Sequence, residues 1–165
     1  MKYVEVRDTI KSGSLLAWSH RGWRTWYDIK VQFVRMFTRS EYSHVGVAWV
    51  TGGRVFVLEA VEPKVRIYPL SSLGSFYLIR DYIPWSNEVE EAALAEIGEE
   101  YSQFEAIANG MSRSINDKWQ CAKYVWYIAE LAGRKLYGKK TPSNVVQNAL
   151  EDGCSIEFIE NKDNI

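Results

Sequence analysis

The chain has few cysteines and histidines, and this scarcity excludes several kinds of site. Its 165 residues include two of each. Cys121 and Cys154 do not make the disulfide framework that staples small secreted domains, although a single bridge between them stays open. Two histidines and two distant cysteines also lack the paired spacing of zinc ligands, so we expect no metal site.

Other absences concern membranes, nucleic acids and cofactors. No run approaches the ~18–20 apolar residues of a membrane span, and residues 1–8 lack the apolar stretch of a secretory signal. We therefore expect a cytoplasmic protein. A net charge of −1 argues against general binding of nucleic acid. Gly-rich phosphate loops, Gly-x-Ser-x-Gly elbows and dinucleotide fingerprints are missing, so we expect no cofactor.

The patterns that are present predict an α+β fold, with an antiparallel sheet packed against helices. Apolar residues make up 47% of the chain and charged residues 25%, which is ordinary for one globular domain covering residues 1–165. Short apolar runs predict strands at residues 15–18, 76–80 and 155–159. Capping residues and later glycines predict helices at residues 86–98 and 117–133, with a short helix from residue 141.

A β-hairpin is the clearest local pattern. Two apolar runs flank the turn sequence Thr51-Gly52-Gly53-Arg54, and His44 interrupts the first run as Glu59 interrupts the second. A turn at Thr51-Gly52 places His44 directly opposite Glu59, whereas a turn at Gly52-Gly53 makes them diagonal neighbours. Both registers put the two side chains on the same face and within reach, unless a bulge flips one of them.

The segment Trp23–Arg39 combines basic residues and tryptophans with the three- and four-residue spacing of an amphipathic helix. Such a segment can bind a membrane surface or a nucleic acid. The commoner interpretation is a solvated helix face over an apolar stripe that belongs to the core.

Cys121 is a candidate nucleophile because it lies one turn inside the helix that opens at Asp117. The exposed amide groups and the positive dipole end at a helix start stabilise a thiolate, and the amide N–H of Cys121 is a natural donor to an oxyanion. The competing interpretation is a small buried hydrophobe, which is the usual fate of a free cysteine. For Cys154, between Gly153 and the last strand, a structural role is favoured.

His44 is the candidate base because the only other histidine, His20, lies in a turn beside Arg21. A carboxylate next to an imidazole fixes the tautomer and orients the ring, and Glu59 is positioned for that task. Spacing alone therefore yields a triad of Cys121, His44 and Glu59 only as a weak candidate.

Four segments of the chain, taken in their order along the sequence, resemble the conserved segments of a known family. Circularly permuted, NlpC-like papain-fold cysteine hydrolases, and the YiiX-like group in particular, have a Gly-Asp strand, a Ser-His-Val-Gly strand, a Glu-Ala strand and a helix that opens with Cys. The corresponding segments here are Ser12–Leu16, Phe37–Val47, Leu58–Ala60 and Gln120–Ala122, and the resemblance spans residues 12–148. It departs from the family at Gly13-Ser14 and at Cys121-Ala122-Lys123, where the family has Gly-Asp and often Cys-Ser-Glu.

The resemblance implies a permuted papain-like fold and a covalent mechanism. Cys121 is then the nucleophile, His44 the general base and Glu59 the orienting group of a Cys-His-Glu triad. Tyr42 and Tyr124 become candidates for contacting substrate, and ordinary packing is an equal alternative for both. Through the resemblance, the expected function is hydrolysis of an amide bond in a peptide or a peptidoglycan stem peptide.

Two alternatives stay open. Relatives in the lecithin retinol acyltransferase group act on lipid acyl groups, and Trp23–Arg39 would then face a membrane. A non-catalytic binding or structural module would keep the fold with a neutral, unreactive thiol at Cys121. The sequence predicts neither the substrate nor the oligomeric state.

Overall fold

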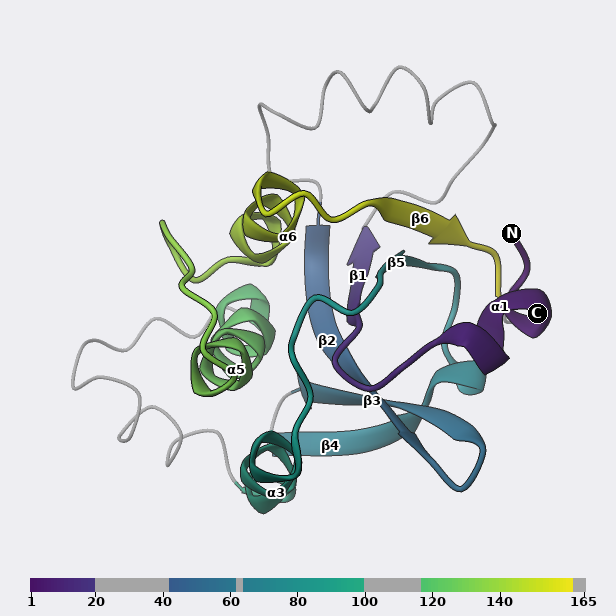
Figure 1. The fold of residues 1–165 in the computed structure, drawn as a ribbon, viewed down its shortest axis with the longest axis horizontal. Helices are drawn as coiled ribbons and strands as arrows, with labels where there is room; N and C mark the ends of the chain where they lie inside the picture. The colour runs from purple at the N-terminus through teal and green to yellow at the C-terminus, as the bar shows by residue number, and fades with distance from the viewer. Residues whose placement is uncertain (20–41, 62–63, 100–116, 162–165) are drawn as a thin grey trace.

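The structure, a computed structural model, describes residues 1–19, 42–61, 64–99 and 117–161. These residues form an α+β fold in which an antiparallel sheet packs against helices, which confirms the predicted fold class (Figure 1). Within them the sheet has six strands in the order β4-β3-β2-β1-β5-β6. The strands are β1 Leu15–Ser19, β2 Tyr42–Thr51, β3 Arg54–Val61, β4 Lys64–Pro69, β5 Phe76–Ile79 and β6 Ile156–Ile159.

Helices cover one side of this sheet. The described helices are α1 Tyr3–Val6, α3 Asn87–Ala95, α5 Asp117–Leu131 and α6 Pro142–Glu151, with the 3₁₀ turns η1 Arg7–Thr9 and η2 Leu70–Ser72. In Figure 1, α5 stands beside β2, with α6 and α3 on either side of it, whereas α1 lies at the far end of the sheet. None of the described helices is long and apolar enough to cross a membrane.

The helix boundaries follow the local signals that predicted them. The hydroxyl of Ser86 accepts a hydrogen bond from the amide of Val89 at the start of α3, and Thr141 accepts one from Asn144 at the start of α6. After α5, Gly133 has a φ of 85°. That left-handed conformation is the usual end of a helix, and glycine adopts it without steric cost.

The hairpin has the second of its two possible registers. Gly52 and Gly53 have φ angles of 55° and 70°, which is the backbone of a type I′ turn. Val47 is paired with Leu58, so extending the register makes His44 and Glu59 diagonal neighbours on one face. A register shift between β1 and β2 falls beyond the pair of Trp18 with His44. It therefore leaves the relation of His44 to Glu59 intact.

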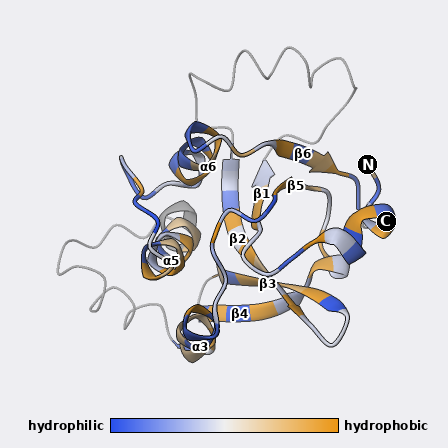
Figure 2. Ribbon diagram, viewed as in Figure 1, coloured by the Kyte–Doolittle hydropathy of each residue, from blue (hydrophilic) through white to orange (hydrophobic). Residues whose placement is uncertain are grey.

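Alternating residues of the strands enter two hydrophobic cores, one on each face of the sheet. Leu15, Ala17, Val45 and Val47 belong to the core shared with α3, α5 and α6. The intervening residues, such as Leu16 and Ala48, pack on the other face against the N-terminal segment. Figure 2 shows the complementary pattern, with hydrophilic residues gathered on the outer turns of α6 and α3.

Strand β4 is the main element that the sequence analysis did not predict. Lys64–Pro69 pairs with β3, and Glu59 lies opposite Arg66. The alternation of Val65 and Ile67 with polar residues is the signal that could have revealed it. The predicted amphipathic helix in Trp23–Arg39 lies outside the described residues.

Gly46 allows β2 and β3 to approach each other beside Glu59. A Cβ atom at Gly46 would lie 2.5 Å from a methyl group of Val57, 3.1 Å from the carbonyl oxygen of Leu58 and 3.4 Å from Cβ of Glu59. The first of these distances is a clash within a wholly buried part of the sheet, because both Val57 and Leu58 have no exposed surface. Only glycine fits this position without moving a strand.

We therefore expect Gly46→Ala to lower the free energy of unfolding by roughly 1–3 kcal/mol, the usual range for overpacking a core. Urea denaturation measures this change. Gly74→Ala is the matched control, because a Cβ at Gly74 meets no atom within 4 Å and its φ is not positive. Equal effects of the two substitutions would contradict the close approach at Gly46.

Candidate active site

The predicted pair of His44 and Glu59 is in direct contact. Nε2 of His44 donates to Oε2 of Glu59 across 2.5 Å. Glu59 is 2% exposed, so its carboxylate meets almost no water, whereas the His44 side chain is 26% exposed. Trp18 lies opposite His44 in β1, and the centres of their rings are 5.3 Å apart. The imidazole is thus held at its edge by a carboxylate and at its side by an indole.

Arg66 is a third member of this cluster, and sequence reasoning missed it together with β4. Its Nε and Nη2 atoms lie 2.9 Å and 2.7 Å from Oε1 of Glu59. One carboxylate oxygen therefore accepts hydrogen bonds from Arg66, and the other accepts one from His44. Because β4 was not predicted, nothing in the sequence analysis placed Arg66 next to Glu59.

Cys121 meets the same histidine from the helical side. It is the fifth residue of α5 and is wholly buried. Its thiol and the His44 side chain form a hydrogen bond. Since Nε2 of His44 is taken by Glu59, the thiol is left with Nδ1. The structure thus brings together Cys121, His44 and Glu59, which come from α5, β2 and β3.

The charges of the neighbours control the ionisation of His44. Burial lowers the pKa of the imidazole, but hydrogen bonds to Cys121 and Glu59, together with their charges, outweigh burial and raise it from 6.5 to about 9. For Glu59, burial raises the pKa of the carboxyl group, whereas His44 and then Arg66 lower it, and the net direction is downward. His44 is therefore the cation and Glu59 the anion at neutral pH.

The backbone around Cys121 departs from one expectation. Only the first four amides of a helix lack an intrahelical acceptor, and α5 begins at Asp117. The amide of Cys121 is the fifth, so it belongs to the regular hydrogen bonding of the helix. We therefore assign it no role as an oxyanion donor.

The two candidate substrate contacts, Tyr42 and Tyr124, are both buried. Tyr42 is 8% exposed and packs edge-on against Tyr77, with ring centres 5.3 Å apart. Tyr124 has no exposed surface, and its hydroxyl donates to the carbonyl oxygen of Ala93 in α3 across 2.8 Å. Burial also raises the pKa of Tyr124. Of the two interpretations, packing is the one that this geometry favours for both residues.

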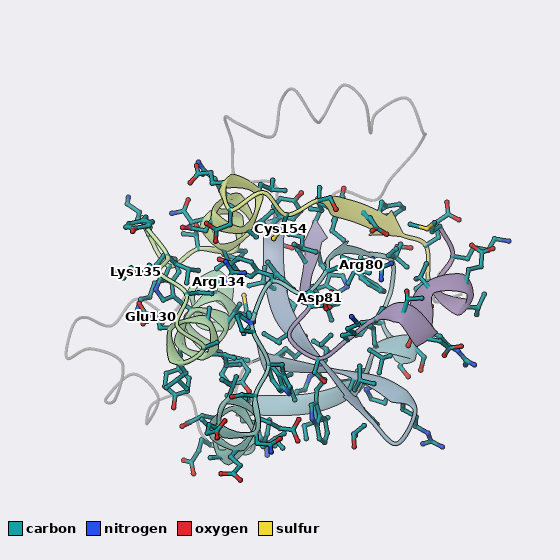
Figure 3. All side chains as sticks on the ribbon, in the orientation of Figure 1. Arg80, Asp81, Glu130, Arg134, Lys135 and Cys154 are labelled. Carbon is teal, nitrogen blue, oxygen red and sulfur yellow. The ribbon has the colours of Figure 1, made fainter. Side chains whose placement is uncertain are left out.

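Cys154 lies where the sequence suggested a structural residue. Neither Cys121 nor Cys154 forms a disulfide bond. Figure 3 shows Cys154 near the end of α6, with Arg134 on the segment that follows α5. Burial raises the pKa of the Cys154 thiol, Arg134 opposes that rise, and Asp152 adds to it. Its amide donates to the carbonyl oxygen of Ala149, so its backbone helps to close α6.

Comparison with known proteins gives a match among the solved structures. No protein-family model matches the chain, and no curated protein does. The crystal structure of metalloprotein yiiX from Escherichia coli O157:H7 matches 78% of this chain and 70% of that chain, with a TM-score of 0.50 and 22% sequence identity. The chain has the yiiX fold. The predicted resemblance to the YiiX-like group is confirmed at this level, and at 22% identity the match concerns the fold alone.

The description of yiiX as a metalloprotein raises the question of whether this chain has residues for a metal ion. Among the residues that the structure describes, no group of three or more His, Cys, Asp or Glu side chains could hold one. The His44–Glu59–Arg66 cluster adds a guanidinium, which repels a cation. This part of the chain does not fit a metal ion.

The raised pKa of His44 gives a prediction that needs no substrate. We expect its imidazole to titrate near pH 9 in the wild-type protein and nearer 6.5 in Glu59→Gln, because that variant loses the neighbouring negative charge. NMR titration of the imidazole signals measures both, and His20→Gln identifies which signal belongs to His44. A titration of His44 that does not respond to Glu59→Gln would contradict the ion pair.

The same shift has a consequence for stability. The folded state binds the His44 proton more tightly than the unfolded chain does, so this proton stabilises the fold fully below pH 6.5. The contribution is lost as the pH rises from 6.5 to about 9. We expect the pH dependence of urea unfolding across this window to be weaker in Glu59→Gln.

Proposed function

We propose that this protein is a cysteine-dependent hydrolase that cleaves amide bonds through an acyl-enzyme. In this proposal Cys121 is the nucleophile, His44 the general base, and Glu59 the residue that orients His44. One observation carries it, namely the continuous chain of hydrogen bonds from Glu59 through His44 to Cys121. A nucleophile, a base in contact with it and a third group that orients the base are the arrangement that activates a side chain for acyl transfer.

The first half of the reaction follows from the two ring nitrogens. Because the Glu59 carboxylate accepts from Nε2–H, Nδ1 is the ring nitrogen on the side of the thiol, and the raised pKa of His44 favours its protonated form. Nδ1 takes the proton of Sγ, and the sulfur attacks the carbonyl carbon of the substrate. The C–N bond then breaks, Nδ1–H gives its proton to the departing amine, and the acyl group stays on Cys121.

In the second half, water releases the acyl group. His44 accepts a proton through Nδ1 from water as its oxygen attacks the thioester, and the C–S bond breaks. The proton returns to sulfur, and a carboxylic acid leaves. Glu59 remains ionised throughout, since His44 and Arg66 hold its pKa down, and it stabilises the imidazolium that forms in both halves.

The substrate class comes from the resemblance to NlpC-like hydrolases rather than from the site. That resemblance favours peptides and peptidoglycan stem peptides, with acyl lipids as the alternative substrate. Peripheral membrane contact through Trp23–Arg39 belongs to the lipid alternative, and this segment lies outside the described residues. A panel of the three substrate classes therefore decides between them.

The reactivity of Cys121 toward iodoacetamide tests the proposed nucleophile. We expect iodoacetamide to alkylate Cys121 at pH 7, because an adjacent imidazolium favours the reactive thiolate. In His44→Ala we expect the rate at pH 7 to fall by roughly tenfold or more. The comparison with His44→Ala at one pH is the measured quantity, because burial slows the alkylation of Cys121 in both proteins.

Cys154→Ser is the control for this measurement, since it removes the other thiol without touching the cluster. An alkylation rate at pH 7 that His44→Ala does not lower would mean that Cys121 is a neutral buried residue. The protein would then fit the non-catalytic module.

The substrate panel gives a separate prediction. After rapid quenching, mass spectrometry should detect an acyl group on Cys121 with peptides or stem peptides, and none with acyl lipids. Cys121→Ala should carry no adduct, whereas Cys154→Ser should carry the same adduct as the wild-type protein. An adduct formed only with acyl lipids would contradict amide hydrolysis and support the alternative that the protein acts on lipid acyl groups.

A further inference from the structure

The carboxylate of Glu59 is divided between two cations on neighbouring strands. Oε2 accepts from Nε2 of His44 in β2, while Oε1 accepts from both Nε and Nη2 of Arg66 in β4. Register produces this division, because Arg66 lies directly opposite Glu59 and His44 lies diagonally across from it. Each oxygen therefore has its own partner.

Arg66 is held in place on its other side as well. Its guanidinium carbon lies 4.5 Å from the centre of the Tyr68 ring, which is on the same face of β4. Its side chain is 40% exposed, whereas the Glu59 carboxylate that it binds is 2% exposed. Arg66 thus covers the carboxylate at the boundary between the cluster and solvent, and its planar fork restrains how the carboxylate can rotate.

We propose that Arg66 is a positioning residue of this site, which by binding Oε1 of Glu59 presents Oε2 to Nε2 of His44 and shares the carboxylate charge. The proposal rests on the function proposed above. Without Arg66, both carboxylate oxygens of Glu59 and the whole of its negative charge are available to His44. An imidazolium stabilised in this way holds its proton more tightly and gives it up more slowly to a departing amine.

Arg66 acts on His44 through Glu59 rather than directly. Among the described residues, the groups that shift the ionisation of His44 are Cys121 from α5 and Glu59 from β3. Arg66 binds Oε1 of Glu59 and His44 binds Oε2, so the carboxylate lies between the two cations. An indirect effect of this kind disappears when the intermediate carboxylate is removed, and a direct one does not.

A double-mutant cycle of Arg66→Gln and Glu59→Gln tests this, with NMR titration of His44 as the readout. We expect Arg66→Gln alone to raise the proton affinity of His44 by about three- to tenfold. In the Glu59→Gln background we expect it to change that affinity by less than about 1.5-fold. Arg66→Lys keeps the charge but lacks the fork, so we expect a smaller rise in the same direction.

Arg80→Gln is the matched control. Arg80, labelled in Figure 3, follows β5 and donates from Nε and Nη2 to Glu157 in β6 across 3.0 Å and 3.2 Å. Strand β1 separates β5 from β2, which carries His44. A role of Arg66 in stability alone predicts that both substitutions lower the midpoint of urea unfolding and leave His44 unchanged. The proposal would be overturned if neither Arg66→Gln nor Arg66→Lys changed the proton affinity of His44. It would also be overturned if Arg66→Gln changed that affinity equally with Glu59 present and in the Glu59→Gln background. If Arg66→Gln does not fold, the Arg66→Lys titration decides alone.

The two proposals fail in different ways. If iodoacetamide shows a neutral Cys121 while Arg66→Gln still shifts His44, the hydrolase proposal fails and the coupling through Glu59 stands. If Cys121 is a thiolate near neutral pH and Arg66→Gln leaves His44 unchanged, only the role of Arg66 is lost.

Discussion

The candidate site depends on one buried carboxylate. Glu59 is 2% exposed, and an isolated charge at that depth would neutralise itself by taking up a proton. It stays ionised because a cation from each neighbouring strand binds one of its oxygens. The same contact raises the pKa of His44, and His44 in turn meets Cys121. Every step of the proposed chemistry therefore depends on the stabilisation of this single buried negative charge by residues on the neighbouring strands.

Several features of the surrounding fold are needed to place these residues next to Glu59. The type I′ turn at Gly52-Gly53 sets the register that makes His44 and Glu59 diagonal neighbours. Gly46 leaves space between the two strands where a side chain would collide with Val57. Strand β4 adds Arg66 on the outer side. The helices contribute at a different point, because burial of α5 against β2 and β3 carries Cys121 to the imidazole.

The likeness to yiiX concerns architecture, and the site has to be argued from its own residues, because one fold can host unrelated chemistries. Here the described residues combine a thiol, an imidazole, a carboxylate and a guanidinium in one hydrogen-bonded series. A metal site instead gathers several donors around one cation. The arrangement in this chain is suited to moving a proton between neighbours, and acyl transfer by a cysteine requires that ability.

Much of this arrangement can be read from local pattern. The caps at Ser86 and Thr141, the alternation along β2 and β3 and the glycine turn are short-range features, and they predicted the elements and the shared face of His44 and Glu59. The resemblance to permuted papain-fold hydrolases suggested Cys121 as their partner. Arg66 is different, because a residue opposite Glu59 is known only once β4 is known to pair with β3. Only the tertiary structure decided which strands are neighbours, how deeply Cys121 is buried and which residue binds each oxygen of Glu59. All three depend on contacts between segments that are distant in the sequence.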